Sequence, residues 1–485
     1  MKQMKKILGM IMAMLLIIVM PSAVRAETGY TITAPDNGHT YEVYQIFTGR
    51  LDAVNTELIN LQWGKNGTGA EGTAVDAAIL TELEQTSGSS DIEKLKLVKK
   101  YVTIKADQAY GTVGEGSAQP MTNVPAGYYL IKDVDGSQTG ENSAYTTYVV
   151  KIVGNIAIQP KMDVPVAEKY VKDINDSQNE ENEWQKTADY DIGDEIPFQM
   201  TAKIPSNYED YESYKIVFHD TQAEGLSFKK DTVKVMVDGK DITENSIVKP
   251  NPEGTETFQI IIEGLKKLSF VKAGSTITVE YKSVLNNNAI HGAEGNSNSM
   301  YLEYSNNPNG EGTGRTPKRE VKVFTYKVVI HKVKPGTGGN QTEPLVGAGF
   351  TLEKRSSGEG DSWKAISGVK DEQGTTFTFS GLDAGEYRLK ETKTPEGYNS
   401  IEPVNFQIAA EHGVDGELKK LSSTATDITF TENVSEGSLT ADILNQKGTT
   451  LPQTGGRGTF LIYMAGVVLV LGAGAALVIK KRRNK

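Results

Sequence analysis

Residues 385–398 read GEYRLKETKTPEGY, a strand pattern followed by a turn that contains proline and glycine. Side chains alternate between the two faces of a strand, so Leu389 and Glu391 share the apolar face of Tyr387. A carboxylate on an apolar face requires an explanation, because burial is costly for the charged form and favours the neutral acid. This stretch therefore predicts a β-strand that carries one buried carboxyl group.

Two flanking segments offer partners for Glu391. Residues 328–333 read VVIHKV, in which Lys332 shares the inward face with two apolar residues, and residues 444–447 supply Asn445. A buried, neutral lysine is a nucleophile, and a neutral carboxylic acid can hydrogen-bond an asparagine carbonyl and make its carbon electrophilic. If the three groups meet, a Lys–Asn isopeptide bond can form with loss of ammonia. The alternative is an ordinary Lys332–Glu391 ion pair with Asn445 in a turn.

A similar triad is expected earlier in the chain. Lys169 shares a strand face with Val171, Asn298 is in phase with the apolar residues of a later strand, and Asp220 lies between them in the chain. Asn296 and Asn306 have the same phase as Asn298, so the choice of acceptor stays open. The alternative is that these asparagines are solvated turn residues.

Both ends of the chain carry targeting patterns. Residues 1–26 combine lysines, an apolar stretch and a small-residue end, which is typical of a signal peptide, although a first transmembrane helix is the alternative. Residues 459–479 carry no charge and the basic residues 480–485 follow them, which predicts a transmembrane segment with a cytoplasmic tail. An extended pentapeptide precedes this segment: Leu451, Pro452, Gln453, Thr454 and Gly455.

Composition restricts the class of protein. The chain has 62 acidic and 51 basic side chains, and removal of the two ends takes away basic residues only, which argues against a nucleic-acid partner. Cysteine is absent, so disulfides cannot reinforce an exported protein. The five histidines form no metal-spaced pair, and we expect neither a metal nor a cofactor. A wall-anchored hydrolase is the enzyme alternative, but no glycosidase-like constellation of carboxylates stands out.

The remaining pattern predicts a mainly all-β chain of tandem antiparallel sandwiches, with a small helical insertion at residues 74–101. Its length suggests about three domains. Domain junctions are expected near residues 160–165 and 315–318, where prolines occur without long flexible linkers, so the domains should form a semi-rigid rod. Short strands rich in β-branched and aromatic residues are expected at 31–33, 145–152, 233–237, 258–262, 276–281, 327–330 and 376–379.

These features resemble the backbone (major) pilins of sortase-assembled Gram-positive pili. Residues 385–398 resemble the glutamate box of Cna-type Ig-like domains, with Thr394 where alanine is more usual, and the segment around Asp220 resembles the catalytic aspartate segment of the pilin middle domain. The resemblance implies isopeptide bonds between first and last strands, with Glu391 and Asp220 catalytic: Lys332–Asn445 and Lys169–Asn298. In the first domain no glutamate occupies the corresponding position, so we assign no bond there.

The C-terminal end resembles a cell-wall sorting signal that sortase cleaves between Thr454 and Gly455. Residues 156–161 read IAIQPK and resemble a pilin motif whose lysine, here Lys161, attacks the sortase intermediate of another subunit. The match is partial, because Gln159 replaces a tyrosine and Ile152 stands where the motif has tryptophan. The alternative is that Lys161 is a solvated strand-end lysine.

The resemblance thus implies a signal peptide (1–26), three pilin domains (27–162, 163–318 and 319–449), a sorting motif (451–455), a transmembrane segment (459–479) and a basic tail (480–485). It implies a non-enzymatic, secreted surface-pilus subunit anchored to peptidoglycan through a transient membrane intermediate. The expected partners are a pilin-specific sortase, a housekeeping sortase, other copies of the chain and ancillary pilins, with a host surface ligand as a further candidate. An ancillary pilin or a wall-anchored adhesin is the alternative function.

Overall fold

The structure is a computed structural model that describes residues 29–448, with gaps at 53, 55–56, 86–90, 118–119, 138–139, 161–162, 178–179, 309–311, 338–340, 357–361 and 414–415. The expected signal peptide, Lys161, the sorting motif, the transmembrane segment and the basic tail therefore lie outside the described residues. Within the described part of the chain, no helix has the length and apolar character needed to cross a membrane.

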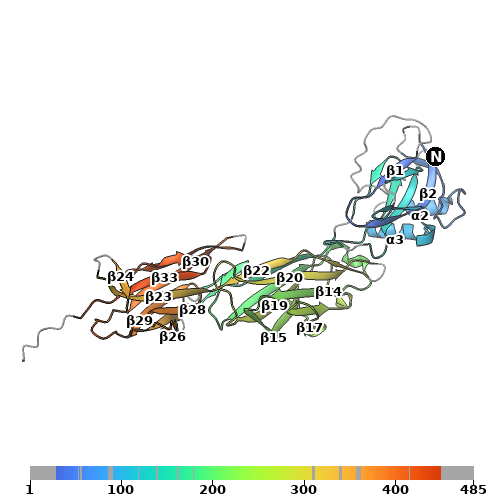
Figure 1. Ribbon diagram of the computed structural model, residues 1–485. Coiled ribbons are helices and arrows are strands. Elements are labelled where there is room, and N and C mark those ends of the chain that lie inside the picture. Colours follow the sequence, from blue (N-terminus) through green and yellow to red (C-terminus); the bar gives the residue numbers. More distant parts are fainter. Residues whose placement is uncertain are drawn as a thin grey trace, which may run out of the picture.

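The molecule is elongated and consists of three successive units (Figure 1). The second and third units lie in line, and the first unit is set at an angle at the far end of the second. The buried apolar residues group accordingly: two clusters lie in the first unit, and one lies in each of the others.

The first unit contains a five-stranded sheet, a three-stranded sheet and two α-helices. The larger sheet has the order β3-β2-β6-β7, with β4 paired to β2, and the smaller has the order β5-β1-β8. The bounds are β1 Tyr30–Thr33, β2 Thr40–Leu51, β3 Leu58–Trp63, α2 Ala77–Gln85, α3 Asp91–Lys99, the 3₁₀ helix η2 Ala106–Gln108, β4 Gly111–Gly114, β5 Met121–Val124, β6 Gly127–Asp133, β7 Thr147–Ile152 and β8 Ile156–Ala157.

The second unit is a sandwich of two large sheets. One has the order β16-β15-β19-β13-β9, and the other has the order β12-β22-β20-β14-β18-β17 with β21 paired to β20. The bounds are β9 Val166–Val171, β10 Ile174–Asn175, β11 Glu180–Glu181, β12 Thr187–Asp189, β13 Glu195–Lys203, η3 Ser206–Asp210, β14 Ile216–Gln222, β15 Leu226–Val237, β16 Lys240–Asp241, η4 Thr243–Asn245, β17 Ser246–Pro250, β18 Phe258–Ile262, η5 Leu265–Lys267, β19 Thr276–Leu285, β20 Asn296–Ser305, β21 Thr313–Arg315 and β22 Arg319–Phe324.

The third unit is also a two-sheet sandwich, with strand orders β27-β28-β23-β33-β32 (β24 paired to β23) and β26-β25-β29-β30-β31. The bounds are β23 Tyr326–Pro335, β24 Thr342–Pro344, β25 Gly349–Ser356, β26 Ser362–Ile366, β27 Val369–Lys370, β28 Thr376–Leu382, β29 Gly385–Lys393, β30 Val404–His412, β31 Leu418–Ala425, β32 Thr431–Asn433 and β33 Ser438–Leu444.

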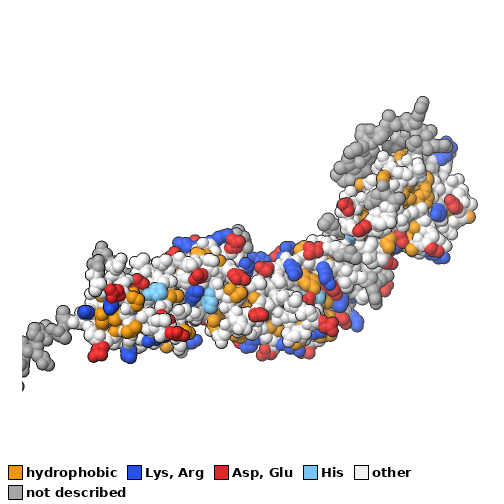
Figure 2. Space-filling view, viewed as in Figure 1, with side chains coloured by type: hydrophobic (Ala, Val, Ile, Leu, Met, Phe, Trp, Pro, Cys, Tyr) orange, Lys and Arg blue, Asp and Glu red, His pale blue; other side chains and the backbone are white. Residues whose placement is uncertain are grey.

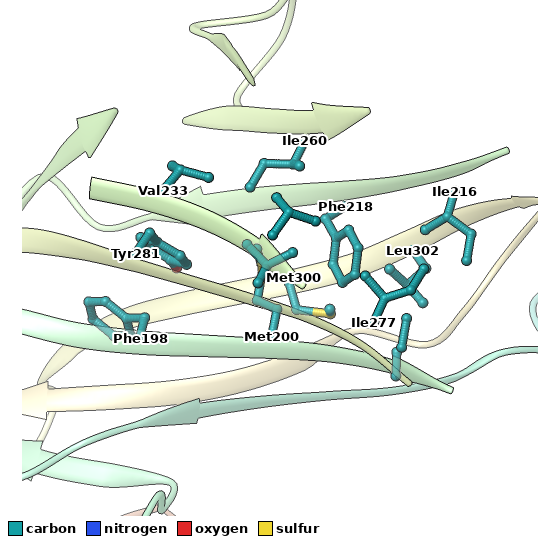
Figure 3. Close-up of a cluster of buried hydrophobic side chains, with 14 of the residues drawn as sticks. Phe198, Met200, Ile216, Phe218, Val233, Ile260, Ile277, Tyr281, Met300 and Leu302 are labelled. Carbon is teal, nitrogen blue, oxygen red and sulfur yellow. The ribbon is translucent and has the colours of Figure 1, made fainter. Parts of the chain in front are cut away.

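Period-two alternation explains how the second sandwich closes. Along β20 and β19 every second side chain is buried, so each strand contributes one row to the space between the sheets. Figure 3 shows this core, in which Phe198 of β13, Phe218 of β14, Tyr281 of β19, and Met300 and Leu302 of β20 converge between the two sheets. The same inward rows carry a small number of polar side chains, and these make up the candidate site.

The mainly all-β class and the tandem sandwiches are confirmed, as is the helical insertion, which forms α2 and α3. The junction between the last two units differs from the expected 318/319. Strand β22 hydrogen-bonds to β20 and β12 of the second sandwich, whereas its last residue, Phe324, packs into the core of the third. Because pairing ties Arg319–Phe324 to the second sandwich, the chain passes into the third unit at about Thr325.

The visible surface mixes acidic and basic side chains along the whole length, and the hydrophobic side chains are scattered in small groups (Figure 2). This mixture agrees with a chain that carries 62 acidic and 51 basic side chains. The candidate site lies in the interior, among the buried polar residues.

Candidate functional site

Lys332 and Asn445 lie side by side because the first and last strands of the third unit pair in parallel. In the register of β23 and β33, Lys332 lies opposite Ile443, and Asn445 follows two residues later on the same face. The Asn445 N–H donates to the carbonyl oxygen of Val333 at 3.1 Å, which continues the ladder past the end of β33. Both side chains are buried, with exposed fractions of 0% and 1%.

Glu391 reaches this pair from the opposite sheet. It lies on β29, and its side chain is fully buried. The Lys332 Nζ atom lies 3.1 Å from Glu391 Oε1 and donates a close hydrogen bond to Asn445 Oδ1. The amide nitrogen of Asn445 donates to both carboxyl oxygens of Glu391, at 2.9 and 3.2 Å. The structure thus brings all three predicted residues into mutual contact.

The orientation of the amide differs from the expected one. Sequence reasoning placed the carboxyl group at the asparagine carbonyl, whereas Glu391 contacts the amide nitrogen and Lys332 contacts the carbonyl oxygen. Thr394, the residue that departs from the family pattern, donates its hydroxyl to Glu391 Oε2 at 3.4 Å, and the Ile401 N–H donates to the same oxygen at 3.2 Å. The threonine therefore supports the carboxyl group.

Burial changes the proton affinity of the nucleophile. Loss of hydration lowers the pKa of Lys332, and its hydrogen bond and charge interaction with Glu391 oppose this only in part. The ammonium also lies 5.3 Å from the centre of the Phe350 ring. The surroundings therefore make the neutral, nucleophilic amine more accessible than on an exposed lysine.

The second unit brings its predicted residues together in a different way. Lys169, on β9, donates to Asp220 Oδ2 on β14 at 2.5 Å. Asn298, on β20, is also fully buried, but among the hydrogen bonds of the described residues none joins it directly to Lys169. Instead, the Tyr281 hydroxyl on β19 lies between them, 2.8 Å from Lys169 Nζ and 2.9 Å from Asn298 Nδ2. All four groups lie together in the core and are linked by hydrogen bonds.

The three candidate acceptors have different surroundings. The side chain of Asn296 is bound to backbone, because its amide nitrogen donates to the carbonyls of Ile290 and Val323 at 3.0 and 3.1 Å. Asn306 lies where the second unit meets the first, and its backbone carbonyl accepts from the N–H of Tyr145 at 3.1 Å. Of the three, Asn298 is the one that shares a hydrogen-bond partner with Lys169.

Burial lowers the pKa of the lysine in this cluster, as it does for Lys332 in the third unit. Loss of hydration lowers the pKa of Lys169, and it raises the pKa of Asp220 despite the stabilising lysine. Burial also raises the pKa of Tyr281 well above its usual value, so the hydroxyl keeps its proton. The carbonyl oxygen of Asn298 is buried and has no hydrogen-bond donor among the described residues, which is a costly state for an unreacted amide.

Sequence reasoning missed Tyr281, although a signal for it exists. The residue is in phase with Ile277 and Val279 on β19, which indicates that its side chain enters the core. The same rule identifies Lys354, which lies two residues after Leu352 on β25, points to the same inward face and is buried. In both cases a residue with a polar group stands in the strand among apolar residues that face the core, which indicates that it is buried.

Lys354 closes the junction between the second and third units. Its ammonium lies 2.7 Å from carboxyl oxygens of Asp191 and Asp383 and also contacts Asp176. These three carboxylates are spaced as metal ligands would be, but the lysine ammonium supplies the positive charge between them. Because three carboxylates outweigh the loss of hydration, the pKa of Lys354 is raised. This lysine is therefore held as a cation and differs from Lys332 and Lys169.

A buried hydrogen-bonded group also lies between the first and second units. His39 Nδ1 is 3.0 Å from Asp133 Oδ1, and His39 Nε2 is 2.5 Å from Ser143 Oγ. The order of groups is that of a hydrolytic triad, but Ser143 is only 4% exposed and its backbone carbonyl accepts from the Tyr304 hydroxyl of the second sandwich at 3.1 Å. The cluster is covered by the neighbouring unit and connects the two.

One segment of the chain matches a known family model. Residues 327–422 match the SpaA family model, described as a prealbumin-like fold domain. The trypsin-resistant surface T6 protein of Streptococcus pyogenes serotype M6 is 26% identical over 362 residues, which are 60% of this chain and 65% of that protein. The fimbrial subunit type 1 of Actinomyces viscosus is 33% identical over 120 residues, 24% of this chain and 18% of that protein. The alignments thus span less than two thirds of either relative.

A solved structure extends the likeness to most of the chain. The T6 backbone pilin of serotype M6 Streptococcus pyogenes, which has a modular three-domain structure, superposes with a TM-score of 0.50 at 19% identity. The match covers 88% of this chain and all of that one. The chain therefore shares the fold of this backbone pilin.

Proposed function

We propose that this chain is a backbone subunit of a covalently polymerised surface pilus of a Gram-positive bacterium. The observation that carries the proposal is the buried contact of Lys332, Glu391 and Asn445, which joins the first and last strands of a sandwich. The pilin fold of the chain and its similarity to a fimbrial subunit support the same function. The chain acts as a structural protein, and its chemistry is confined to its own cross-links.

In the third unit, we expect the Lys332 side chain to form an amide with Asn445. The ammonium gives one proton to Glu391, and the neutral amine attacks the side-chain carbon of Asn445. Glu391 then protonates the departing amide nitrogen, with which it is already in contact, and takes the second proton of the attacking amine. Of the three ammonium protons, one stays on the new amide, one leaves in the ammonia and one remains on Glu391.

The same reaction in the second unit joins Lys169 to Asn298 with Asp220 as the carboxyl group. The Tyr281 hydroxyl, which contacts both Lys169 and Asn298, supports Asn298 as the acceptor, whereas the Asn296 amide is bound to backbone carbonyls and Asn306 lies at the junction with the first unit. Both reactions need folding to assemble the three groups and to exclude water from them, so neither needs an external enzyme.

Polymerisation uses residues outside the described part of the chain. A pilin-specific sortase cleaves the Leu451–Gly455 motif after Thr454 and holds Thr454 as an acyl-enzyme, which Lys161 of another copy attacks. Lys161 follows directly after Pro160, in the segment that connects β8 of the first unit to β9 of the second. The finished filament carries ancillary pilins and is attached to peptidoglycan by a housekeeping sortase, after export and a transient membrane stage.

The polymerisation step is tested by co-expression of the chain with a pilin-specific sortase and denaturing electrophoresis of the surface extract. Lys161→Ala should abolish the ladder of high-molecular-weight bands and leave the monomer, as should Thr454→Ala. Lys105→Ala is the matched control, because Lys105 is an exposed lysine of the first unit and its loss should leave the ladder intact. An intact ladder with Lys161→Ala would favour an ancillary pilin or a wall-anchored adhesin, the alternative function.

A further inference from the structure

The two candidate cross-linking clusters differ in how many of the reacting side chains their carboxyl group contacts. In the third unit, Glu391 contacts both reacting side chains directly: Lys332 Nζ at 3.1 Å and Asn445 Nδ2 at 2.9 Å. In the second unit the carboxyl group is an aspartate, which is one methylene shorter. Asp220 contacts Lys169, but among the described hydrogen bonds none joins it to Asn298.

The Tyr281 hydroxyl fills this gap. Its oxygen accepts hydrogen bonds from Lys169 Nζ at 2.8 Å and from Asn298 Nδ2 at 2.9 Å, and its proton is donated to Asp220 Oδ2 at 2.8 Å. A phenol has one donor and two acceptor positions, so all three are used. Tyr281 is thus in contact with the nucleophile, the carboxyl group and the leaving nitrogen.

The ring of Tyr281 is fixed by aromatic neighbours. Its ring lies next to that of Phe198 (Figure 3), on which it stacks with centroids 5.4 Å apart, and it meets Phe258 and Phe228 edge-on at 5.0 and 5.7 Å. Only 2% of the residue is exposed. This packing holds the hydroxyl in place before the reaction and keeps water from replacing it.

We propose that Tyr281 is a third catalytic residue of the second unit, which relays a proton between Asp220 and the leaving nitrogen of Asn298. The inference rests on the proposed Lys169–Asn298 bond. Asp220 takes one proton from the Lys169 ammonium, and the neutral amine attacks the side-chain carbon of Asn298. Tyr281 gives its hydroxyl proton to the departing nitrogen and takes the proton of Asp220, which then takes the second proton of the attacking amine. Ammonia leaves, Asp220 ends protonated and Tyr281 is unchanged.

The test uses a chain of residues 27–450, which keeps every described residue, made by cell-free synthesis and sampled over time. Peptide mass spectrometry follows the Lys169–Asn298 cross-link, and the Lys332–Asn445 cross-link serves as an internal reference. Tyr281→Phe keeps the ring and removes the hydroxyl. We expect the Lys169–Asn298 bond to form about 10²-fold more slowly, as for loss of a positioned proton donor, with an unchanged rate in the third unit.

Two further variants separate catalysis from structure. Tyr214→Phe removes a hydroxyl from another tyrosine of the same core, which is 1% exposed and whose ring contacts among the described residues are with Tyr208 and Tyr211, and it should react at the wild-type rate. In the Tyr281→Phe background, Asp220→Glu restores the longer carboxyl group of the third unit, and should recover much of the rate. Misfolding would not be corrected by this second substitution.

The outcomes distinguish this inference from the proposed function. If the wild-type chain forms no Lys169–Asn298 bond, the proposed cross-link is wrong and the role of Tyr281 falls with it. If the wild-type chain forms the bond and Tyr281→Phe forms it at the same rate, the relay alone is overturned. Failure of Asp220→Glu to raise the rate of the Tyr281→Phe chain would likewise contradict the relay.

Discussion

Lys332 and Lys354 are buried lysines of the same sandwich whose surroundings have opposite effects. Lys332 faces one carboxyl group, and loss of hydration dominates, so its pKa is lowered. Lys354 is surrounded by Asp176, Asp191 and Asp383, and their combined charge raises its pKa. The number of carboxylates around a buried lysine therefore decides whether it is suited to nucleophilic attack or to holding two units together.

At the residue scale, we predict that Glu391→Gln prevents cross-linking in the third unit. The glutamine side chain preserves the shape of the site, but it can neither accept the proton of Lys332 nor protonate the leaving nitrogen. Removal of one member of a buried ion pair also costs about 3–5 kcal/mol, so the unit should unfold at a lower temperature. Peptide mass spectrometry and thermal unfolding measure the two effects.

The matched control for this substitution is Glu386→Gln, on the same strand, where the glutamate pairs with Arg355 at the surface. It should leave both the cross-link and, within about 1 kcal/mol, the stability unchanged. A complete Lys332–Asn445 bond in the Glu391→Gln chain would exclude Glu391 as the catalytic group.

At the scale of elements, the position of the cross-link determines the path of tension. The chain enters the third unit on β23 and leaves it after β33, and the two strands are parallel neighbours. An amide between Lys332 and Asn445 passes tension directly from one strand to the other, so the part of the sandwich between them bears no load. Without the amide, the ladder of hydrogen bonds between β23 and β33 would bear the load in shear.

Single-molecule pulling measures this difference. We predict that Lys332→Ala allows the third unit to extend by roughly 380 Å, the fully extended length of the 113 residues that separate Lys332 from Asn445. The wild-type unit should show no such step. Lys334→Ala, which removes a half-buried lysine of the same strand that pairs with Glu343, is the control and should behave as wild type. An extension step of this size in the wild-type protein would argue against the covalent path.

Strand alternation was sufficient to predict much of the site. It identified Lys332, Lys169, Glu391 and Asn298 as inward-facing polar residues, and the structure places all of them in the core. It could not predict which strands of the two sheets face one another, because the register across a sandwich depends on packing between segments far apart in the chain. For this reason Tyr281, which joins the cluster across the sandwich, was not recognised.

The same limit explains the domain junctions. Prolines indicated where the chain leaves one unit, but β22 continues the second sandwich beyond the expected boundary through hydrogen bonds to β20 and β12. The carboxylates that meet Lys354 belong to two units and are distant in sequence. Local pattern carries no information about such a contact, although it does indicate that Lys354 itself points inward.

At the scale of the whole molecule, the junction of the second and third units should make stability depend on pH. Asp189 accepts hydrogen bonds from the Ala384 N–H at 2.8 Å and the Tyr326 hydroxyl at 3.1 Å across this junction, and burial raises its pKa to about 7. The folded protein therefore keeps the Asp189 proton up to about pH 7, whereas an unfolded chain loses it near pH 4. Between these values the folded state binds more protons, so this group makes stability fall as pH rises.

We predict that Asp189→Asn, which imitates the neutral acid, removes this part of the pH dependence. Relative to wild type, the variant should gain at least about 1.4 kcal/mol in free energy of unfolding between pH 5 and pH 8, the equivalent of one pKa unit. Chemical denaturation at both values measures the gain. Burial lowers the pKa of neighbouring His412 to about 4, which acts in the opposite direction in both proteins. A constant difference between variant and wild type at both pH values would contradict the prediction.

The most direct measurement is the intact mass of residues 27–450 produced in the absence of any sortase. Two self-formed Lys–Asn bonds predict a mass below that of the sequence by two ammonia molecules, with the cross-linked peptides containing Lys169 with Asn298 and Lys332 with Asn445. A folded chain with the full mass of its sequence would contradict the account, because neither strand pair would then be covalently joined.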